Sequence, residues 1–97
     1  MIHSADTIRY VNDAFCRLVG ADSPAAVTGR SPEAFVVEAD RELLVGHFDG
    51  LRHDDAAVDG VTVEVERLDG TRIDAATVSS LVAWNDETLV QTSMVGI

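Results

Sequence analysis

A run of β-patterned stretches separated by tight turns fills the C-terminal part of the chain, and no other feature constrains the fold as strongly. The stretch Val61–Arg67 alternates apolar and polar residues, which is the pattern of a strand with one buried face. Asp69-Gly70 and Asn85-Asp86 are residue pairs that favour hairpin turns. Further strands are therefore expected at Ile73–Ala83 and Thr88–Val95. The pattern predicts an antiparallel meander of three strands.

Upstream of this meander, the pattern predicts one strand followed by several helices. The stretch Thr7–Val11 is rich in β-formers and ends at Asn12-Asp13, where either residue can cap a helix that Gly20 would end. Two Ser-Pro pairs, at residues 23–24 and 31–32, each favour a short helix, because Ser is a good cap and Pro suits the first turn.

One longer helix is expected after Asp40, which is its candidate cap. Its apolar stripe at helical spacing consists of Leu43, Leu44, His47, Phe48 and Leu51. Together these elements predict an α+β fold, in which an antiparallel sheet of about five strands carries short helices and one long helix on one face. A chain of 97 residues is too short for two separate cores, so residues 1–97 are expected to form a single domain.

The charge balance restricts the partners of the chain. There are 17 acidic residues against 7 basic ones, the net charge is −10, and every basic residue is Arg. Such a surface repels nucleic acid and anionic lipid, so neither is expected as a partner. An acid-rich surface without Lys favours a halophilic source, although an ordinary acidic protein from a high-GC genome has a similar composition.

Neither a membrane segment nor a disulfide is expected. The chain has no apolar run near the length of about 20 residues that a membrane-spanning helix needs, and Met1 opens no signal peptide. Cys16 is the single cysteine, which excludes an internal disulfide and fits a small buried side chain better than a reactive thiol. A cytoplasmic location is therefore expected.

Five segments, in the right order and at the right spacing, resemble a PAS domain. They are Ile8–Phe15, Leu18-Val19-Gly20, Gly29–Pro32, Glu38–Arg41 and Arg67–Thr71. The resemblance covers nearly the whole chain. It implies a cytoplasmic signal-sensing and interaction module, often a homodimer, which passes a conformational change to an attached kinase or transducer output domain.

Both ends of the chain differ from a full PAS domain. Gly96-Ile97 stands where the family often has an Asp followed by Ile or Leu, which affects the usual coupling to a following helix. Only Met1–Ser4 represents the family's first strand. We therefore expect that the domain belongs to a longer multidomain signalling protein.

Alternation along the strands allows the residues of a ligand pocket to be predicted, because every second side chain faces the core. The pocket would bind a small organic molecule between the sheet and the helices; the alternative is a filled core in a dimerisation module without a ligand. The candidate pocket residues are Phe35, Leu44, His47, Phe48, Val61, Val63, Ala75, Thr77, Val90, Thr92 and Met94.

Two cofactors of the family are not expected. A photoactive flavin adduct requires Cys and Gln where the resemblance places Pro32 and Met94, and flavin binding without the adduct stays open. Oxygen-sensing haem requires a ligating His where it has Leu44. His47 is expected to be a core residue, and no metal site is expected, although His53 beside Asp54-Asp55 is a weak candidate for a hard cation.

The alternate residues of the strands, which point away from the core, form an apolar outer face that is a candidate interface. Its residues are Val78, Val82, Leu89 and Val95. Trp84 is expected to be a packing anchor. The chain is not expected to be an enzyme, because the acids considered as a general base, Asp74 and Asp69, have outward parity or lie in a turn.

Overall fold

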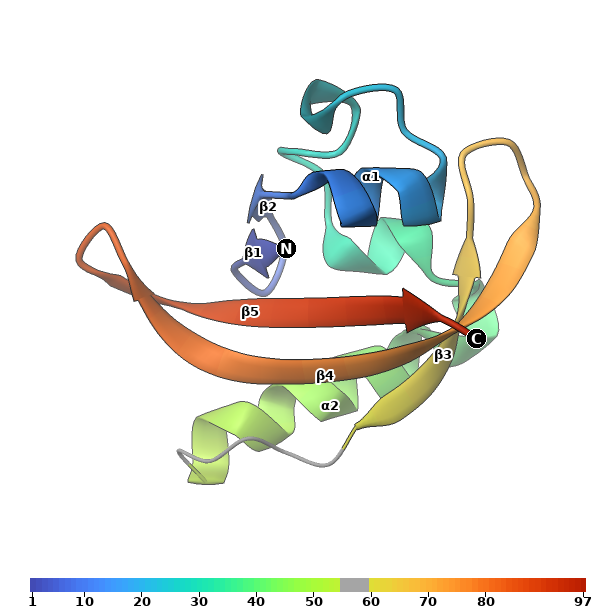
Figure 1. Ribbon diagram of the computed structural model, residues 1–97. Coiled ribbons are helices and arrows are strands. Elements are labelled where there is room, and N and C mark those ends of the chain that lie inside the picture. The colour runs from blue at the N-terminus through green and yellow to red at the C-terminus, as the bar shows by residue number, and fades with distance from the viewer. Residues whose placement is uncertain (55–59) are drawn as a thin grey trace.

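The computed structural model describes the backbone of residues 1–54 and 60–97, which form an α+β fold around a five-stranded antiparallel sheet. The spatial order of the strands is β2-β1-β5-β4-β3, so the last strand, β5, is central and β1 lies between β2 and β5 (Figure 1). The strands are β1 (Ile2–His3), β2 (Ile8–Tyr10), β3 (Val61–Glu66), β4 (Arg72–Trp84) and β5 (Glu87–Gly96).

Short helical elements connect β2 to the one long helix, and all but the last of them were predicted. They are α1 (Asp13–Val19) and three 3₁₀ helices, η1 (Pro24–Ala26), η2 (Pro32–Phe35) and η3 (Glu38–Asp40). The long helix α2 (Arg41–Asp54) then leads back to the sheet. In the view of Figure 1, α1 lies above the β4–β5 ribbon and α2 lies below it. The two strands curve and twist strongly between these helices.

The predicted end signals of α1 are confirmed. The Asn12 side-chain oxygen accepts a hydrogen bond from the backbone N–H of Phe15 at 3.0 Å. Gly20 adopts the left-handed conformation (φ 76°) that closes the helix. This conformation favours glycine, because a Cβ atom would be strained there.

Both turns of the meander form where the sequence predicted them. Asn85 and Asp86 have positive φ values (48° and 66°) and connect β4 to β5 as a two-residue turn. Asp69 accepts hydrogen bonds from the hydroxyl and the N–H of Thr71, and these bonds hold the pKa of its carboxyl below the usual range. The β4–β5 register runs without a break from Ala75 opposite Gly96 to Trp84 opposite Glu87.

The start of α2 differs from the prediction. Asp40 lies in η3, and its carboxylate accepts a hydrogen bond from the N–H of Glu64 in β3 at 2.7 Å, so it fastens the helix start to the sheet. Leu43, expected on the buried stripe, is 48% exposed. The helix packs with a narrower apolar face than the sequence pattern indicated, because only Leu44, His47, Phe48 and Leu51 of the stripe are buried.

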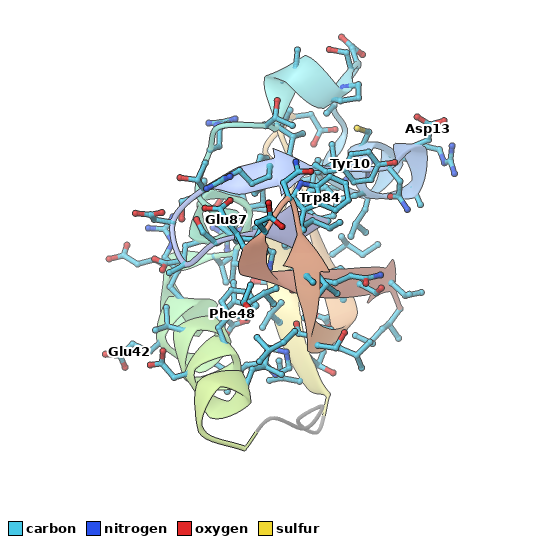
Figure 2. All side chains as sticks on the ribbon, turned by 90° about the vertical axis from the view of Figure 1, so that its left-hand side faces the viewer. Tyr10, Asp13, Glu42, Phe48, Trp84 and Glu87 are labelled. Atoms are coloured by element: carbon cyan, nitrogen blue, oxygen red, sulfur yellow. The ribbon has the colours of Figure 1, made fainter. Side chains whose placement is uncertain are left out.

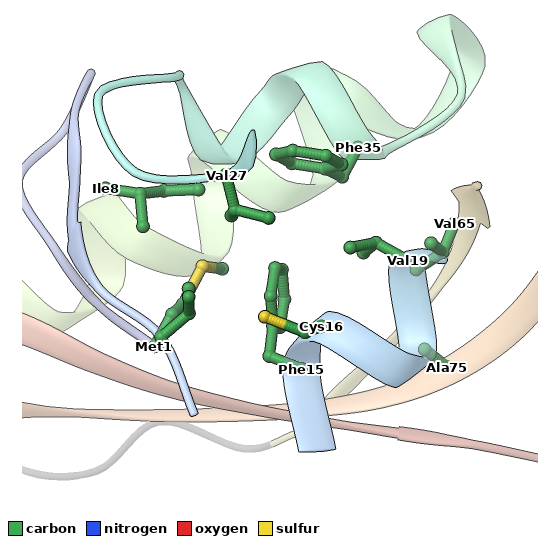
Figure 3. Packing of buried hydrophobic residues seen from close by; sticks show 10 residues of the cluster. Met1, Ile8, Phe15, Cys16, Val19, Val27, Phe35, Val65 and Ala75 are labelled. Carbon is green, nitrogen blue, oxygen red and sulfur yellow. The ribbon is translucent and has the colours of Figure 1, made fainter. Parts of the chain in front are cut away.

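The buried side chains form two apolar clusters on the helical side of the sheet. The first gathers around α1 and η2 and includes Phe15 and Phe35, whose rings pack edge to face with centroids 6.0 Å apart (Figure 3). The second lies under α2 and includes Leu44, Phe48 and Val63. Both clusters contain side chains predicted to line the pocket.

Candidate ligand-binding core

Four buried polar side chains form a hydrogen-bonded network inside the core. The Nε2 atom of His47 in α2 lies 2.9 Å from the Oγ atom of Ser79 in β4. Ser79 Oγ lies 2.8 Å from Thr92 Oγ1 in β5, and Thr92 Oγ1 lies 2.7 Å from Nε2 of His3 in β1. The other ring nitrogen of His3 contacts the Ser4 carbonyl oxygen at 2.8 Å. We call His3, His47, Ser79 and Thr92 the polar network.

Strand register explains how residues so distant in sequence meet. Ser79 and Thr92 are directly opposite each other in the β4–β5 pairing, so their hydroxyls lie on the same face of the sheet. Backbone hydrogen bonds between Met1 and Thr92 continue the pairing of β1 with β5, and they bring His3 to the same region. The α2 helix then places His47 above Ser79.

Aromatic packing surrounds the two histidines. The ring of Phe48 packs against both, with its centroid 4.7 Å from that of His3 and 5.7 Å from that of His47. His3 is fully buried, and this burial lowers the pKa of its imidazole to about 4. His3 is therefore neutral at physiological pH.

The predicted pocket residues lie on the inner side of the fold, buried or half-buried. Phe35 and Ala75 belong to the first cluster, and Met94 packs against both clusters. The second cluster contains or packs against Leu44, Phe48, Val61, Val63 and Val90. The polar candidates His47, Thr77 and Thr92 are buried as well. Their role in ligand binding stays a prediction.

Sequence reasoning missed His3 as a core residue. A strand of two residues has no readable alternation, and the contact of His3 with Thr92 spans 89 positions of sequence. The hydroxyl of Ser79 has the same parity as Ala75 and Thr77, so alternation alone places it in the core.

The structure also locates the residues considered for cofactors and metals. Leu44 is a fully buried residue of α2, and Pro32 is buried at the start of η2. Within residues 1–51 and 60–97, whose side chains are described, no group of three or more potential metal-ligating side chains comes together. The candidate cation site at His53 and Asp54-Asp55 lies outside the residues whose side chains are described.

The outer face of the sheet agrees only partly with its prediction. Val78 and Val95 are 55% and 65% exposed, and Val82 is half-buried. Leu89, however, is 5% exposed, so its expected place on an open surface is wrong. Leu89 lies on β5, between the strands that carry Tyr10 and Trp84, and the rings of these two residues meet at a centroid distance of 5.9 Å (Figure 2). Leu89 is diagonal to Trp84 across the β4–β5 pair, since its direct partner Val82 lies two residues before Trp84, and a ring at that position is within reach of Leu89.

Two hollows of the described surface adjoin the polar network. One, with a volume of about 190 Å³, lies between α1 and β5 and is lined by residues that include Phe15, Thr92 and Met94. The other, of about 210 Å³, is an open depression in the outer face around Val78 and Ser93.

The two acids weighed as general bases do not lie in the core. Asp74 and Asp69 are both exposed.

The five-stranded antiparallel sheet, with its short helices and one long helix, defines the class of the protein as a small α+β domain. The model of one family, the PAS fold, matches residues 1–96, and the chain belongs to this family. PAS domains are generally sensory modules without catalytic activity. No curated protein sequence is similar enough to the chain to count as a relative. Within the described residues, no helix is both long enough and apolar enough to cross a membrane.

Solved structures share this fold. The PAS domain of an HTR-like protein from Haloarcula marismortui is 26% identical, with a TM-score of 0.74 over 97% of this chain and 78% of that chain. The PAS domain of nitrogen regulation protein NR(II) from Vibrio parahaemolyticus is 16% identical, with a TM-score of 0.77 over 99% and 85%. The blue-light activated histidine kinase EL346 of Erythrobacter litoralis is 19% identical, with a TM-score of 0.69 over 98% of this chain and 32% of the kinase.

Proposed function

We propose that this domain is the signal-input module of a longer, cytoplasmic signalling protein. A small organic molecule binds in the core between the sheet and α2, and binding changes the packing of α2 against the sheet. An attached kinase or transducer output domain responds to this change, which is a shift of population between two arrangements.

The observation that carries this proposal is the polar network within an otherwise apolar core. Burying polar groups is costly unless each finds a partner, and apolar side chains of similar size fill a purely structural core with less risk. A few polar groups that converge among apolar and aromatic side chains are typical of small-molecule sites. His47 connects α2 to this network, so a ligand that competes for Ser79 acts directly on the helix.

The similar proteins support the proposal that the domain is attached to an output domain. One is a blue-light activated histidine kinase, of which the match covers 32%, so most of that protein lies outside its PAS-like part. Another is the PAS domain of a nitrogen regulation protein. By analogy, residues 1–97 are the input domain of a multidomain protein.

Native mass spectrometry of the purified domain, compared with its mass after denaturation, tests the proposal. A small molecule that leaves on unfolding supports a ligand-binding core and shows its chemical class. If none is released, a thermal-shift screen with small organic molecules follows. Thr92→Leu then serves as the blocking variant, because the larger side chain fills the site. Intact ligand affinity and intact output in this variant would contradict the proposal.

A second candidate function is a dimerisation module, and the uncharged outer face favours it. Residues 75–85 and 88–97 contain no charged side chain, although the whole chain carries a net charge of −10. Two such acidic copies repel each other except where they meet through a face without charges. The exposed Val78 and Val95 lie on that face, so we propose it as the contact between two copies.

Sedimentation of matched variants tests the dimer. Val78→Glu adds a charge at the proposed contact, and Leu43→Glu adds the same charge at an exposed position of α2. The first variant is expected to be monomeric, and the second is expected to behave as the wild type. A wild-type domain that stays monomeric at high concentration would remove this candidate.

We also propose that the acidic surface suits high salt, with the protein contacting neither nucleic acid nor membrane. Screening by salt relieves the mutual repulsion of 17 acidic side chains. The melting temperature is therefore expected to rise steadily with KCl concentration up to molar levels. A flat or falling dependence would favour an ordinary acidic protein.

A further inference from the structure

The direction of every hydrogen bond in the polar network follows from its contact with the Ser4 carbonyl. A carbonyl oxygen only accepts, so the Nδ1 atom of His3 carries the ring proton. His3 is neutral, which leaves its Nε2 atom as an acceptor, and the hydroxyl of Thr92 donates to it.

The remaining bonds are then fixed one after another. Thr92 has used its single hydrogen, so the hydroxyl of Ser79 donates to Thr92. Ser79 has in turn used its hydrogen, so the Nε2–H group of His47 donates to Ser79. This last step holds whether His47 is neutral or charged, because Nε2 carries a proton in the charged ring as well as in this tautomer.

The network thus presents acceptors to anything that approaches it. The hydroxyls of Ser79 and Thr92 each donate once and accept once, which leaves one lone pair on each oxygen. The buried hydroxyl of Thr77 donates to the Ala75 carbonyl at 3.4 Å, so its lone pairs remain as well. All three hydroxyls therefore present acceptor lone pairs to the core, because each has already donated its hydrogen.

We propose that the ligand of this core is an uncharged molecule that donates a hydrogen bond to Ser79 or Thr92, such as a phenol, an alcohol or an amide N–H, and is not a carboxylate or a phosphate. This inference rests on the proposed function and names the chemical class that the same site accepts. His3 determines this specificity indirectly, because its tautomer sets the direction of the hydroxyls that contact the ligand.

Charge restricts the ligand in both directions. An anion would place its lone pairs against those of the hydroxyls, and it would approach a protein with a net charge of −10. A cation is disfavoured too, because the burial that keeps His3 neutral penalises any positive charge in the same place. A neutral donor avoids both penalties.

Three probes of similar size test the proposal on the whole chain: phenol, toluene and benzoate. Their affinities are measured at pH 7.5 by NMR titration, following the backbone signals of Thr77 and Thr92. Phenol is expected to bind about five- to tenfold more tightly than toluene, as one net hydrogen bond provides. Benzoate is expected not to bind. Thr92→Val is expected to reduce the preference for phenol, and Thr62→Val, the same change at an exposed position, is expected to leave it unchanged.

The outcomes separate this inference from the proposed function. If toluene binds as tightly as phenol, or benzoate binds more tightly, the core holds ligands but the inference is wrong. If none of the probes shifts the signals of the core, the small-molecule function itself loses its support, and the inference falls with it.

A measurement without any ligand tests the hydrogen-bond directions alone. The ¹⁵N chemical shifts of an imidazole distinguish a protonated nitrogen from a bare one. His3 is expected to show a protonated Nδ1 and a bare Nε2, and His47 a protonated Nε2. A His3 ring protonated at Nε2 would reverse the network and overturn the proposal.

Discussion

Replacing Thr92 by Val removes the central hydroxyl of the polar network while nearly preserving the shape of the side chain. Thr92 is fully buried, donates to His3 at 2.7 Å and accepts from Ser79 at 2.8 Å. Val suits a strand as well as Thr does, so the backbone of β5 is expected to stay as it is. The variant leaves two buried groups without their partner: the Nε2 atom of His3 and the hydroxyl of Ser79.

The expected loss of stability follows from these two groups. A buried polar group that loses its partner costs about 1–3 kcal/mol, and exchanging a hydroxyl for a methyl group returns about 1 kcal/mol. The free energy of unfolding is therefore expected to fall by about 1–5 kcal/mol. For a domain of this size, where 1 kcal/mol shifts the melting temperature by about 4–8 °C, the melting temperature would fall by about 5 °C or more.

Urea denaturation of the wild type, Thr92→Val and Thr62→Val provides the assay. Thr62 is exposed, so its variant is expected to change stability by less than about 0.5 kcal/mol. Adding Ser79→Ala to Thr92→Val should destabilise less than Ser79→Ala does alone, since the two residues share one hydrogen bond. A loss below about 0.5 kcal/mol in Thr92→Val would refute the view that these bonds stabilise the core.

Three further predictions concern pH, the start of α2 and a helix end. Burial lowers the folded-state pKa of His3 from 6.5 to about 4. The folded state therefore gains its full stability from neutral His3 above pH 6.5, and it loses this stability as the pH falls toward 4. In urea unfolding, the wild type should lose on the order of 3 kcal/mol more than His3→Gln between pH 7 and 4; parallel curves would contradict this. Asp40→Ala should cost about 1–3 kcal/mol, because the N–H of Glu64 loses its acceptor, and hydrogen exchange at Glu64 should accelerate. Gly20→Ala should cost about 1–2 kcal/mol through strain at φ 76°, and unchanged thermal stability would refute the strain.

Most of the fold was predictable because local signals agreed with one another. The cap at Asn12, the stop at Gly20 and the turn at Asn85-Asp86 depend on conformations that few other residues adopt, and all three are confirmed. The alternation in β3 and β4 likewise identified their inner faces, since Val63 and Ala75 are buried. Such signals depend on neighbouring residues alone.

The parts that could not be predicted depend on contacts between distant residues. Nothing in its sequence neighbourhood places His3 in the core; its pairing with β5 does. Leu89 has outward parity but is buried, and its diagonal neighbour across the β4–β5 pair is the large ring of Trp84, which alternation along one strand does not describe. Asp40 looked like a helix cap, yet the approach of β3 gives its carboxylate another donor.

The polar network also lies close to the surface proposed for dimerisation. Successive residues of a strand point to opposite faces, so Ser79 and Thr92, whose hydroxyls enter the core, directly adjoin Val78 and Ser93, which line the outer depression. A small movement of the paired strands that changes the Ser79–Thr92 contact therefore also moves Val78 and Ser93 on the outer face. The two candidate functions are in this way compatible: ligand binding inside the sheet and contact between two copies outside it use opposite faces of the same β4–β5 pair.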